Sequence, residues 1–299
     1  MWKPDDEQTR LLEMLCEQRR NLVDERTRLV NELGSVLKQY FPQAATLFED
    51  QLKSKMACAF LERWPTLDAL QRTRPQTIRK FFYAHRSRSE TKIQQRLELI
   101  AQATPLVTDA ALLEACRTRV ESLVIRLQAL LTPIARLDKR INELMDAHQD
   151  AALFRGLPGA GAALAPRLLA AFGSDRNCYE SAEEIQSYSG AAPVTRRTVG
   201  PQAKPMVSFR WACPKFLRQT FHEFTQHSRS RSVWAGAFYE LQRSRGKSHH
   251  AAIRSLAYKW IRIIFRCWKN RTAYDEQRYL KSLLQRQSPL SERIQALVA

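Results

Sequence analysis

The segment Leu113–Leu144, LEACRTRVESLVIRLQALLTPIARLDKRINEL, decides the fold class of this chain. Its apolar residues recur at steps of three and four without a break: Leu113, Cys116, Val120, Leu123, Leu127, Leu130, Ile134, Leu137, Ile141 and Leu144. This spacing is a heptad seam along one face of a long helix, for which Thr108 is the expected N-cap. One helix cannot bury such a stripe alone. Its partner is the first helix, another segment of the chain, or a second copy that makes a homo-oligomer through a coiled coil.

The rest of the N-terminal half is also typical of helices. The first 150 residues contain a single glycine, Gly34, and are rich in Leu, Arg, Glu and Gln. We expect helices at about 7–40, 45–63 and 76–84, with Thr66 as an N-cap. Glycines become frequent after residue 150, and no strand alternation is long enough to build a sheet. The sequence therefore predicts an all-α fold: a helical connector (1–150), a helical domain (151–275) and a loosely ordered tail (276–299).

Composition limits the function classes. The 299 residues carry a net charge of +18 and are 44% hydrophobic, which predicts a folded chain with a polyanionic partner, most commonly nucleic acid. There is no apolar run long enough for a membrane span and no secretory signal, so we expect a cytoplasmic, nucleoid-associated protein. The six cysteines and six histidines show no metal-ligand spacing, and no metal is expected in this chain.

The segment LPGAG at 157–161 precedes a helix at about 163–172. It resembles the turn of a helix-hairpin-helix element, in which backbone N–H groups bind a phosphate oxygen. Gly159 and Gly161 are therefore candidate DNA contacts. The alternative is a helical corner that simply packs against its neighbour.

A second candidate site follows a capping box at 181–184 and an expected left-handed C-cap at Gly190. The segment 193–205 is predicted to be a loop that combines hydroxyls with cations, namely Thr195, Arg196, Arg197, Thr198 and Lys204. A hydroxyl beside guanidinium groups can attack a phosphate, because the cations stabilise the developing charge. The alternative is a loop that only grips a nucleic-acid backbone.

Cations and aromatic residues then alternate in two stretches. The first contains Arg210, Trp211, Lys215, Arg218 and Phe221, and the second is a helix at about 249–270, capped by Ser248, with Arg254 and Arg262. Helical spacing assigns the aromatic residues mainly to the core and the cations to phosphate contacts.

Several motifs together resemble one family. They are LPG at 157–159, YSGAAPVT at 188–195, FRWAC at 209–213, SVWA at 232–235, RGKSH at 245–249 and WKNRTAYDE at 268–276. In this order they resemble the C-terminal part of transposases of the "one-ten" insertion-sequence family. The resemblance extends to the segment DDEQTR at 5–10 and covers nearly the whole chain.

This resemblance implies an insertion-sequence DNA transposase that pairs a RuvC-like DEDD domain with a serine domain and is guided by a bridge RNA. Magnesium is expected only with the RuvC-like domain, which would precede Met1 and is not in this sequence. The family's nucleophilic serine falls on Thr198, whose added methyl group restricts its rotamers. Two alternatives remain open: a catalytically inactive nucleic-acid-binding, self-associating protein, and a structural partner of a full-length transposase.

Overall fold

The computed structural model describes residues 5–197, 205–291 and 293–294. The fold is all-α, as predicted, apart from one short β-hairpin. The chain divides into a helical unit, Gln18–Asp138, and a second unit made of Met1–Glu17 and Lys139–Ala299, which we call the C-terminal unit. These divisions fall inside the two longest helices, whereas the sequence suggested a boundary at residues 149–152.

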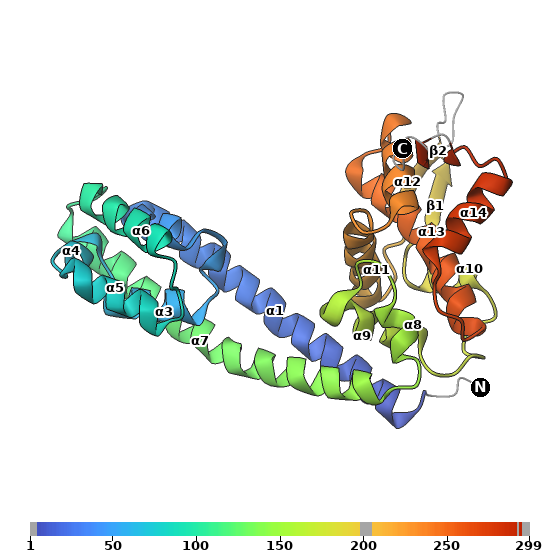
Figure 1. Cartoon of the computed structure of the whole chain (residues 1–299), viewed down its shortest axis with the longest axis horizontal. Helices are drawn as coiled ribbons and strands as arrows, with labels where there is room; N and C mark the ends of the chain where they lie inside the picture. The colour runs from blue at the N-terminus through green and yellow to red at the C-terminus, as the bar shows by residue number, and fades with distance from the viewer. Residues whose placement is uncertain (1–4, 198–204, 292, 295–299) are drawn as a thin grey trace. The chain divides into compact units, whose positions relative to one another are not determined.

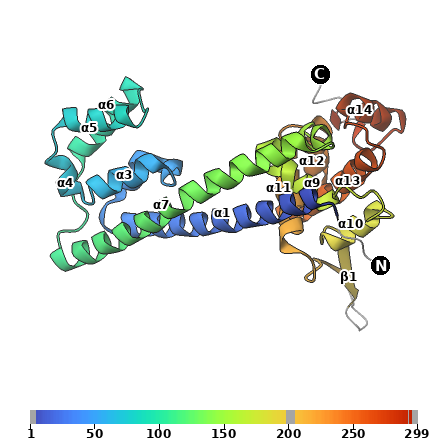
Figure 2. The ribbon, with the colours of Figure 1, turned by 90° about the horizontal axis from the view of Figure 1, so that it is seen from below.

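The two long helices are α1 (Glu7–Tyr40) and α7 (Ala110–Ala147), which lie side by side in both ribbon views (Figures 1 and 2). They run antiparallel in the helical unit, because Arg119 pairs with Glu32 at 2.9 Å and Arg19 pairs with Asp138. The heptad residues are buried between Cys116 and Ile134, together with α1 residues such as Leu29 and Leu33. The stripe is thus covered within one chain. The expected cap Thr108 is wrong, since Oδ1 of Asp109 accepts the N–H groups of residues 111 and 112 instead.

Short helices complete the helical unit: α2 (Pro42–Phe48), the 3-10 turn η1 (Glu49–Gln51), α3 (Lys55–Arg63), α4 (Leu67–Gln71), α5 (Pro75–Ala84) and α6 (Glu90–Gln102). The continuous helix expected at 45–63 is wrong, because Glu49 adopts a φ of 42° and interrupts it. Thr66 is an N-cap as predicted. Phe60 is fully buried in ring contact with Phe48, Trp64, Phe81 and Phe82, which makes it the centre of this core.

The C-terminal unit contains α8 (Ala151–Arg155), α9 (Gly161–Phe172), α10 (Ala182–Tyr188), β1 (Pro193–Arg197), β2 (Pro205–Phe209), α11 (Lys215–Ser228), α12 (Val233–Ser244), α13 (His249–Lys269) and α14 (Glu276–Gln285). Helix α13 begins at the predicted cap Ser248 and contributes two fully buried tryptophans. Trp260 donates to Oγ of Ser228, and Trp268 donates to the carbonyl oxygen of Gly173, both at 2.8 Å. These bonds satisfy the indole N–H groups that burial would otherwise leave unpaired.

Two expectations for this unit need correction. Strands β1 and β2 form an antiparallel hairpin where the sequence suggested a loop. Each strand has only five residues and begins with proline, so no long alternation marks it, and a two-stranded hairpin tolerates proline because both strands are edges. The tail expected to be loosely ordered contains α14, which buries Leu280 and Leu283.

The start of the chain belongs to the C-terminal unit. The carboxylate of Asp5 accepts the backbone N–H of Ser174 at 2.9 Å, and Thr9 bonds the buried ring of His148 at 3.1 Å. Within the described ranges, no helix has both the length and the apolar character needed to cross a membrane.

Candidate nucleic-acid interface

Positive charge is concentrated in residues 186–299. This segment holds 21 of the 48 Lys and Arg residues of the chain but only 5 of its 30 Asp and Glu residues. It comprises the hairpin and helices α11 to α14, all of which lie in the C-terminal unit. One unit therefore carries a strongly cationic set of elements on a packed aromatic core, the electrostatic pattern expected of a polyanion-binding surface.

The first part of the predicted catalytic segment, residues 193–197, forms strand β1 of the hairpin. Cα partners in its register include Thr195 with Val207, Arg196 with Met206 and Arg197 with Pro205. Figure 2 shows β1 extending away from the neighbouring helices of its unit. Thr198 and Lys204, the other two candidates of this segment, lie outside the described residues. The backbone thus places residues 193–197 and 205–209 at a projecting edge of the unit.

The base of the hairpin is attached to its unit by hydrogen bonds. Gly190 ends α10 with a φ of 73°, the predicted left-handed cap. The next turn is anchored by Ala192, whose N–H donates to the carbonyl oxygen of Gln186 at 2.8 Å. Gln186 is fully buried and donates in turn to the carbonyl oxygen of Tyr258 on α13 at 2.7 Å. These bonds connect the hairpin to the central helix of the core.

The capping box expected at α10 is not formed, because Glu184 accepts the N–H of Glu180 instead of that of the N-cap Ser181. The Ser181 side chain makes no capping bond, whereas the Glu184 carboxylate accepts the N–H of Glu180 at 2.9 Å. The helix nevertheless begins at Ala182, so the predicted start is confirmed although the predicted bonds are not.

Aromatic and cationic side chains are exposed at this base. Trp211 is 75% exposed and Tyr188 is 52% exposed, and Arg210 and Lys215 are exposed as well. The assignment of aromatic residues to the core is correct for Phe221 and Trp260 but wrong for Trp211. The helical spacing that supported a core assignment does not apply to Trp211, because it lies between the end of β2 and the start of α11.

The glycine turn before α9 has two different environments. A β-carbon on Gly159 would come within 2.8 Å of the backbone of His227 and Ser228, so this glycine permits close packing against the end of α11. A β-carbon on Gly161 would meet nothing within 4 Å. The environment of Gly159 therefore agrees with the alternative that this turn is a corner that packs against a neighbouring helix. Gly161 instead lies at an exposed helix start that a phosphate can reach.

The remaining predicted contacts are distributed over the unit. Arg218 is half-buried on α11. Arg254 lies close enough to His222 of α11 that its charge helps lower the histidine's pKa, behind burial and the charges of two neighbouring histidines. Arg262 instead lines a cleft between α13 and α14. The structure therefore does not gather all predicted contacts into one site.

Comparisons with known proteins match separate parts of the chain. Residues 1–42 match a family of transposases with a DEDD domain, and residues 151–240 match the family described as "Transposase IS116/IS110/IS902 family". These two segments meet in the C-terminal unit through the bonds of Asp5 to Ser174.

Longer similarities cover most of the chain. It is 27% identical over 285 residues to the "Mini-circle putative transposase for IS117" of Streptomyces coelicolor, covering 94% of this chain and 68% of that protein. It is 25% identical to an uncharacterized IS110 protein of the same organism, covering 91% of this chain and 66% of that protein. It is 26% identical to an uncharacterized IS900 protein of Mycobacterium paratuberculosis, covering 88% of this chain and 65% of that protein. The chain thus spans about two thirds of the length of these relatives.

Proposed function

We propose that this chain is the C-terminal part of an insertion-sequence transposase, which binds DNA and cuts and rejoins its strands. The two family matches, at residues 1–42 and 151–240, are both to transposases. The observation that carries the proposal is the projecting hairpin on a cationic, aromatic-cored unit, within the segment that matches the IS116/IS110/IS902 transposases. Exposed Arg210, Lys215 and Trp211 at its base supply phosphate and base contacts.

The proposed chemistry is a pair of transesterifications. The Thr198 hydroxyl oxygen attacks a DNA phosphorus, forms a new P–O bond to the protein and breaks the P–O bond to one sugar oxygen, which leaves with a proton. A sugar hydroxyl of another strand then attacks the same phosphorus and releases the threonine with its proton restored. Arg196 and Arg197 precede Thr198 and supply positive charge for the phosphorane oxygens. The assignment of Thr198 rests on the resemblance.

A metal has no step in this scheme. Among residues 5–197, 205–291 and 293–294, no three His, Cys, Asp or Glu side chains are placed to hold an ion. The resemblance assigns magnesium to the RuvC-like domain, and this assignment stays a prediction. The guide RNA and self-association through the long helices stay predictions.

Trapping of a protein–DNA adduct tests the chemistry. We expect the parent protein and Thr198→Ser to form a covalent adduct with labelled element-end DNA on a denaturing gel, and Thr198→Ala to form none. The assay uses the full-length protein, because its relatives are longer than this chain. If neither the parent nor the serine variant forms an adduct while DNA binding persists, the nucleophile is wrong and the chain only binds nucleic acid.

Binding is tested separately. We expect Arg210→Gln with Lys215→Gln to lower the affinity for DNA and to reduce the slope of log affinity against log salt by about 0.9 for each duplex phosphate that the variant no longer neutralises. Trp211→Ala should weaken single-stranded DNA binding by about 1–3 kcal/mol, whereas Trp211→Phe keeps most of the stacking. Salt-independent binding, or none at low ionic strength, would refute the proposed DNA contact.

A further inference from the structure

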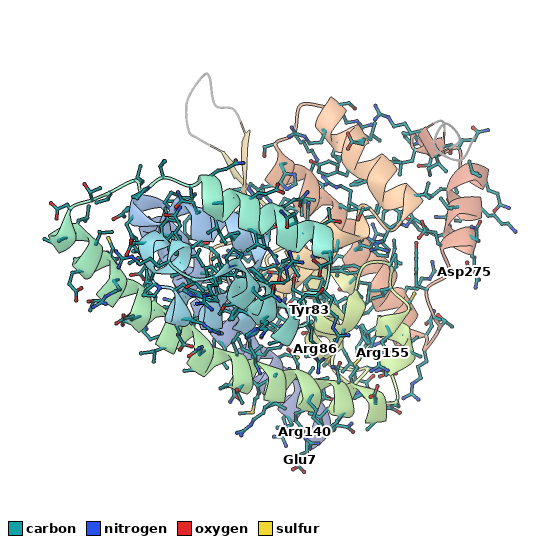
Figure 3. The ribbon with its side chains drawn as sticks, turned by 60° about the vertical axis from the view of Figure 1, so that its left-hand side comes forward. Glu7, Tyr83, Arg86, Arg140, Arg155 and Asp275 are labelled. Carbon is teal, nitrogen blue, oxygen red and sulfur yellow. The ribbon has the colours of Figure 1, made fainter. Side chains whose placement is uncertain are left out.

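A cleft of about 810 Å³ lies between α13, α14 and the segment that joins them. Its walls carry five cations, which are Lys259, Arg262 and Arg266 from α13, Arg278 from α14 and Arg286 directly after α14. Among the described residues that line it, Asp275 is the one carboxylate. Figure 3 labels Asp275 at the start of α14. The family match ends at residue 240, before either helix begins, so the comparison assigns this cleft no role.

Among the described residues, the cations of the cleft have no carboxylate partner. Oδ1 of Asp275 accepts the backbone N–H of Arg278 at 3.0 Å, so this carboxylate acts as the N-cap of α14. In the described part of the chain, no ion pair involves any of the five cations. A surface cation is usually solvated, but five cationic residues that line one concavity form a focused positive potential.

Lys259 shows how burial and a neighbouring cation affect a positive charge in this cleft. The residue is half-buried, and its ammonium group lies over the rings of Phe238 and Trp234 of α12, at 4.8 and 5.6 Å from their centroids. Burial, followed by the charge of Arg262, lowers its pKa. Burial raises the pKa of Tyr279 in the same cleft to about 12, although Arg286 and Arg262 both act to lower it. Guanidinium groups from both walls therefore lie close enough to Tyr279 to affect its pKa. A bound anion would reduce the repulsion between these positive charges.

The spacing of the cations fits a polymer with repeated charges. Lys259, Arg262 and Arg266 are three and four residues apart, so they share one face of α13 and extend over about 10 Å. Successive phosphates of one strand in duplex DNA are about 3.4 Å apart along the axis, so four consecutive phosphates span a similar distance. Because cationic residues line both walls of the cleft, a strand that enters is held from two sides, whereas a duplex presents its phosphates on a convex surface to one wall.

We propose that the α13–α14 cleft binds the phosphate backbone of single-stranded DNA, as a second grip separate from the hairpin. This inference rests on the proposed function, in which strands must separate before they are exchanged. The cleft holds the strand by charge, and its cations carry no base preference.

Paired charge-removing variants test the cleft. We expect Arg262→Gln with Arg266→Gln to weaken binding of a single-stranded oligonucleotide at least tenfold and to lower its salt slope by about 1.4, since each single-strand phosphate contact contributes about 0.7. Duplex binding should change less than threefold. Arg278→Gln with Arg286→Gln, on the other wall, should reproduce the effect. The matched control is Arg271→Gln with Lys281→Gln, two exposed cations of the same segment that do not line the cleft.

The outcomes separate this inference from the proposed function. If the parent protein binds no DNA, the proposed function fails. If hairpin variants weaken binding but both cleft pairs behave like the control, only the cleft inference fails. An equal loss of duplex binding, or a loss confined to an RNA oligonucleotide of the same sequence, also overturns it. Equal losses for single-stranded DNA and RNA support a backbone grip.

Cys267 provides an independent local measurement, because it lines the cleft and its thiol is free. Burial raises its pKa, so alkylation is run at a mildly alkaline pH where some thiolate is present. We expect single-stranded DNA to protect Cys267 from maleimide, while the exposed Cys178 reacts at an unchanged rate. Protection of both cysteines or of neither would contradict binding in the cleft.

Discussion

A β-carbon on Gly190 would lie 2.5 Å from Sγ of Cys213, closer than any real side chain allows. This contact joins the end of α10 to the turn that follows β2, so both ends of the hairpin meet there. The glycine also has a φ of 73°, which costs other residues about 1–2 kcal/mol. The attachment of the hairpin thus depends on the absence of one side chain.

We therefore expect Gly190→Ala to lower the free energy of unfolding by about 2–4 kcal/mol, from backbone strain and overpacking together. Urea denaturation measures it. Gly246→Ala is the matched control, because Gly246 has a φ of 80° but a β-carbon there meets nothing within 4 Å. Replacing Cys213 with Ala in the Gly190→Ala background should recover part of the loss. Equal losses at the two glycines would show that the Cys213 contact is unimportant.

A buried ion pair fixes the segment between α9 and α10. Nη2 of Arg176 lies 2.6 Å from Oδ1 of Asp150, and the two side chains are only 13% and 5% exposed. We expect Arg176→Ala to lower the free energy of unfolding by about 3–5 kcal/mol, because it leaves the Asp150 charge buried without its partner. Arg155→Ala is the control, since the Arg155–Asp146 pair is exposed and should contribute under about 1 kcal/mol. Figure 3 labels Arg155. Similar losses in thermal or urea unfolding would argue against a structural role for the buried pair.

The structure predicts an acid-sensitive contact between α11 and α13. Nε2 of His222 lies 3.4 Å from Nδ1 of His250, and burial, followed by the charges of His250, His249 and Arg254, lowers the pKa of His222, with Glu223 opposing. A histidine whose pKa is lower in the folded state binds its proton first in the unfolded state. The free energy of unfolding should therefore fall as the pH drops below about 6.5 toward the folded-state pKa.

Replacement of this histidine tests the sign. We expect His222→Gln to flatten the decline in unfolding free energy between pH 7.5 and 5, measured by urea denaturation at each pH. His227→Gln, an exposed histidine of the same helix, should leave the slope as in the parent protein. An unchanged slope in the His222 variant would assign the acid sensitivity to other groups.

The local sequence pattern was sufficient to predict many of the helices and their caps. The apolar steps from Leu113 to Leu144 predict α7 and its buried face, and the bounds of α1 agree with the structure because Pro42 forbids continuation beyond Phe41. Ser248 and Thr66 cap helices because capping depends only on residues within one turn. Failures at Thr108 and Glu49 are also local. A neighbouring aspartate is the better cap, and one left-handed residue divides an otherwise helical segment.

The candidate sites were less accessible to sequence reasoning, because they depend on contacts between distant segments. The α13–α14 cleft brings Arg262 and Arg286 into one lining, and no periodicity within either helix specifies that packing. The hairpin exists because residues 193–197 pair with 205–209, a relationship that no single five-residue strand reveals. The exposure of Trp211 follows from its place after β2, whereas its sequence neighbours suggested a core position.

The glycine turn before α9 allows packing and phosphate contact to be separated. Gly159 has a φ of 85° and lies against the backbone of residues 227 and 228, which cannot move without displacing the end of α11. Gly161 has a φ of 55° and faces open space. We expect Gly159→Ala to lower the free energy of unfolding by more than about 2 kcal/mol, from strain and overpacking. Gly161→Ala should cost only about 1 kcal/mol of strain.

DNA affinity then identifies the role of each glycine. If the exposed start of α9 binds a phosphate, Gly161→Ala should weaken DNA binding several-fold while the protein remains folded, since the added methyl group crowds the approach to its N–H groups. Gly159→Ala should weaken binding only in proportion to the unfolded fraction measured by circular dichroism. If Gly161→Ala binds DNA as the parent does, the turn is a packing corner. The phosphate contacts then belong to the hairpin base and the cleft.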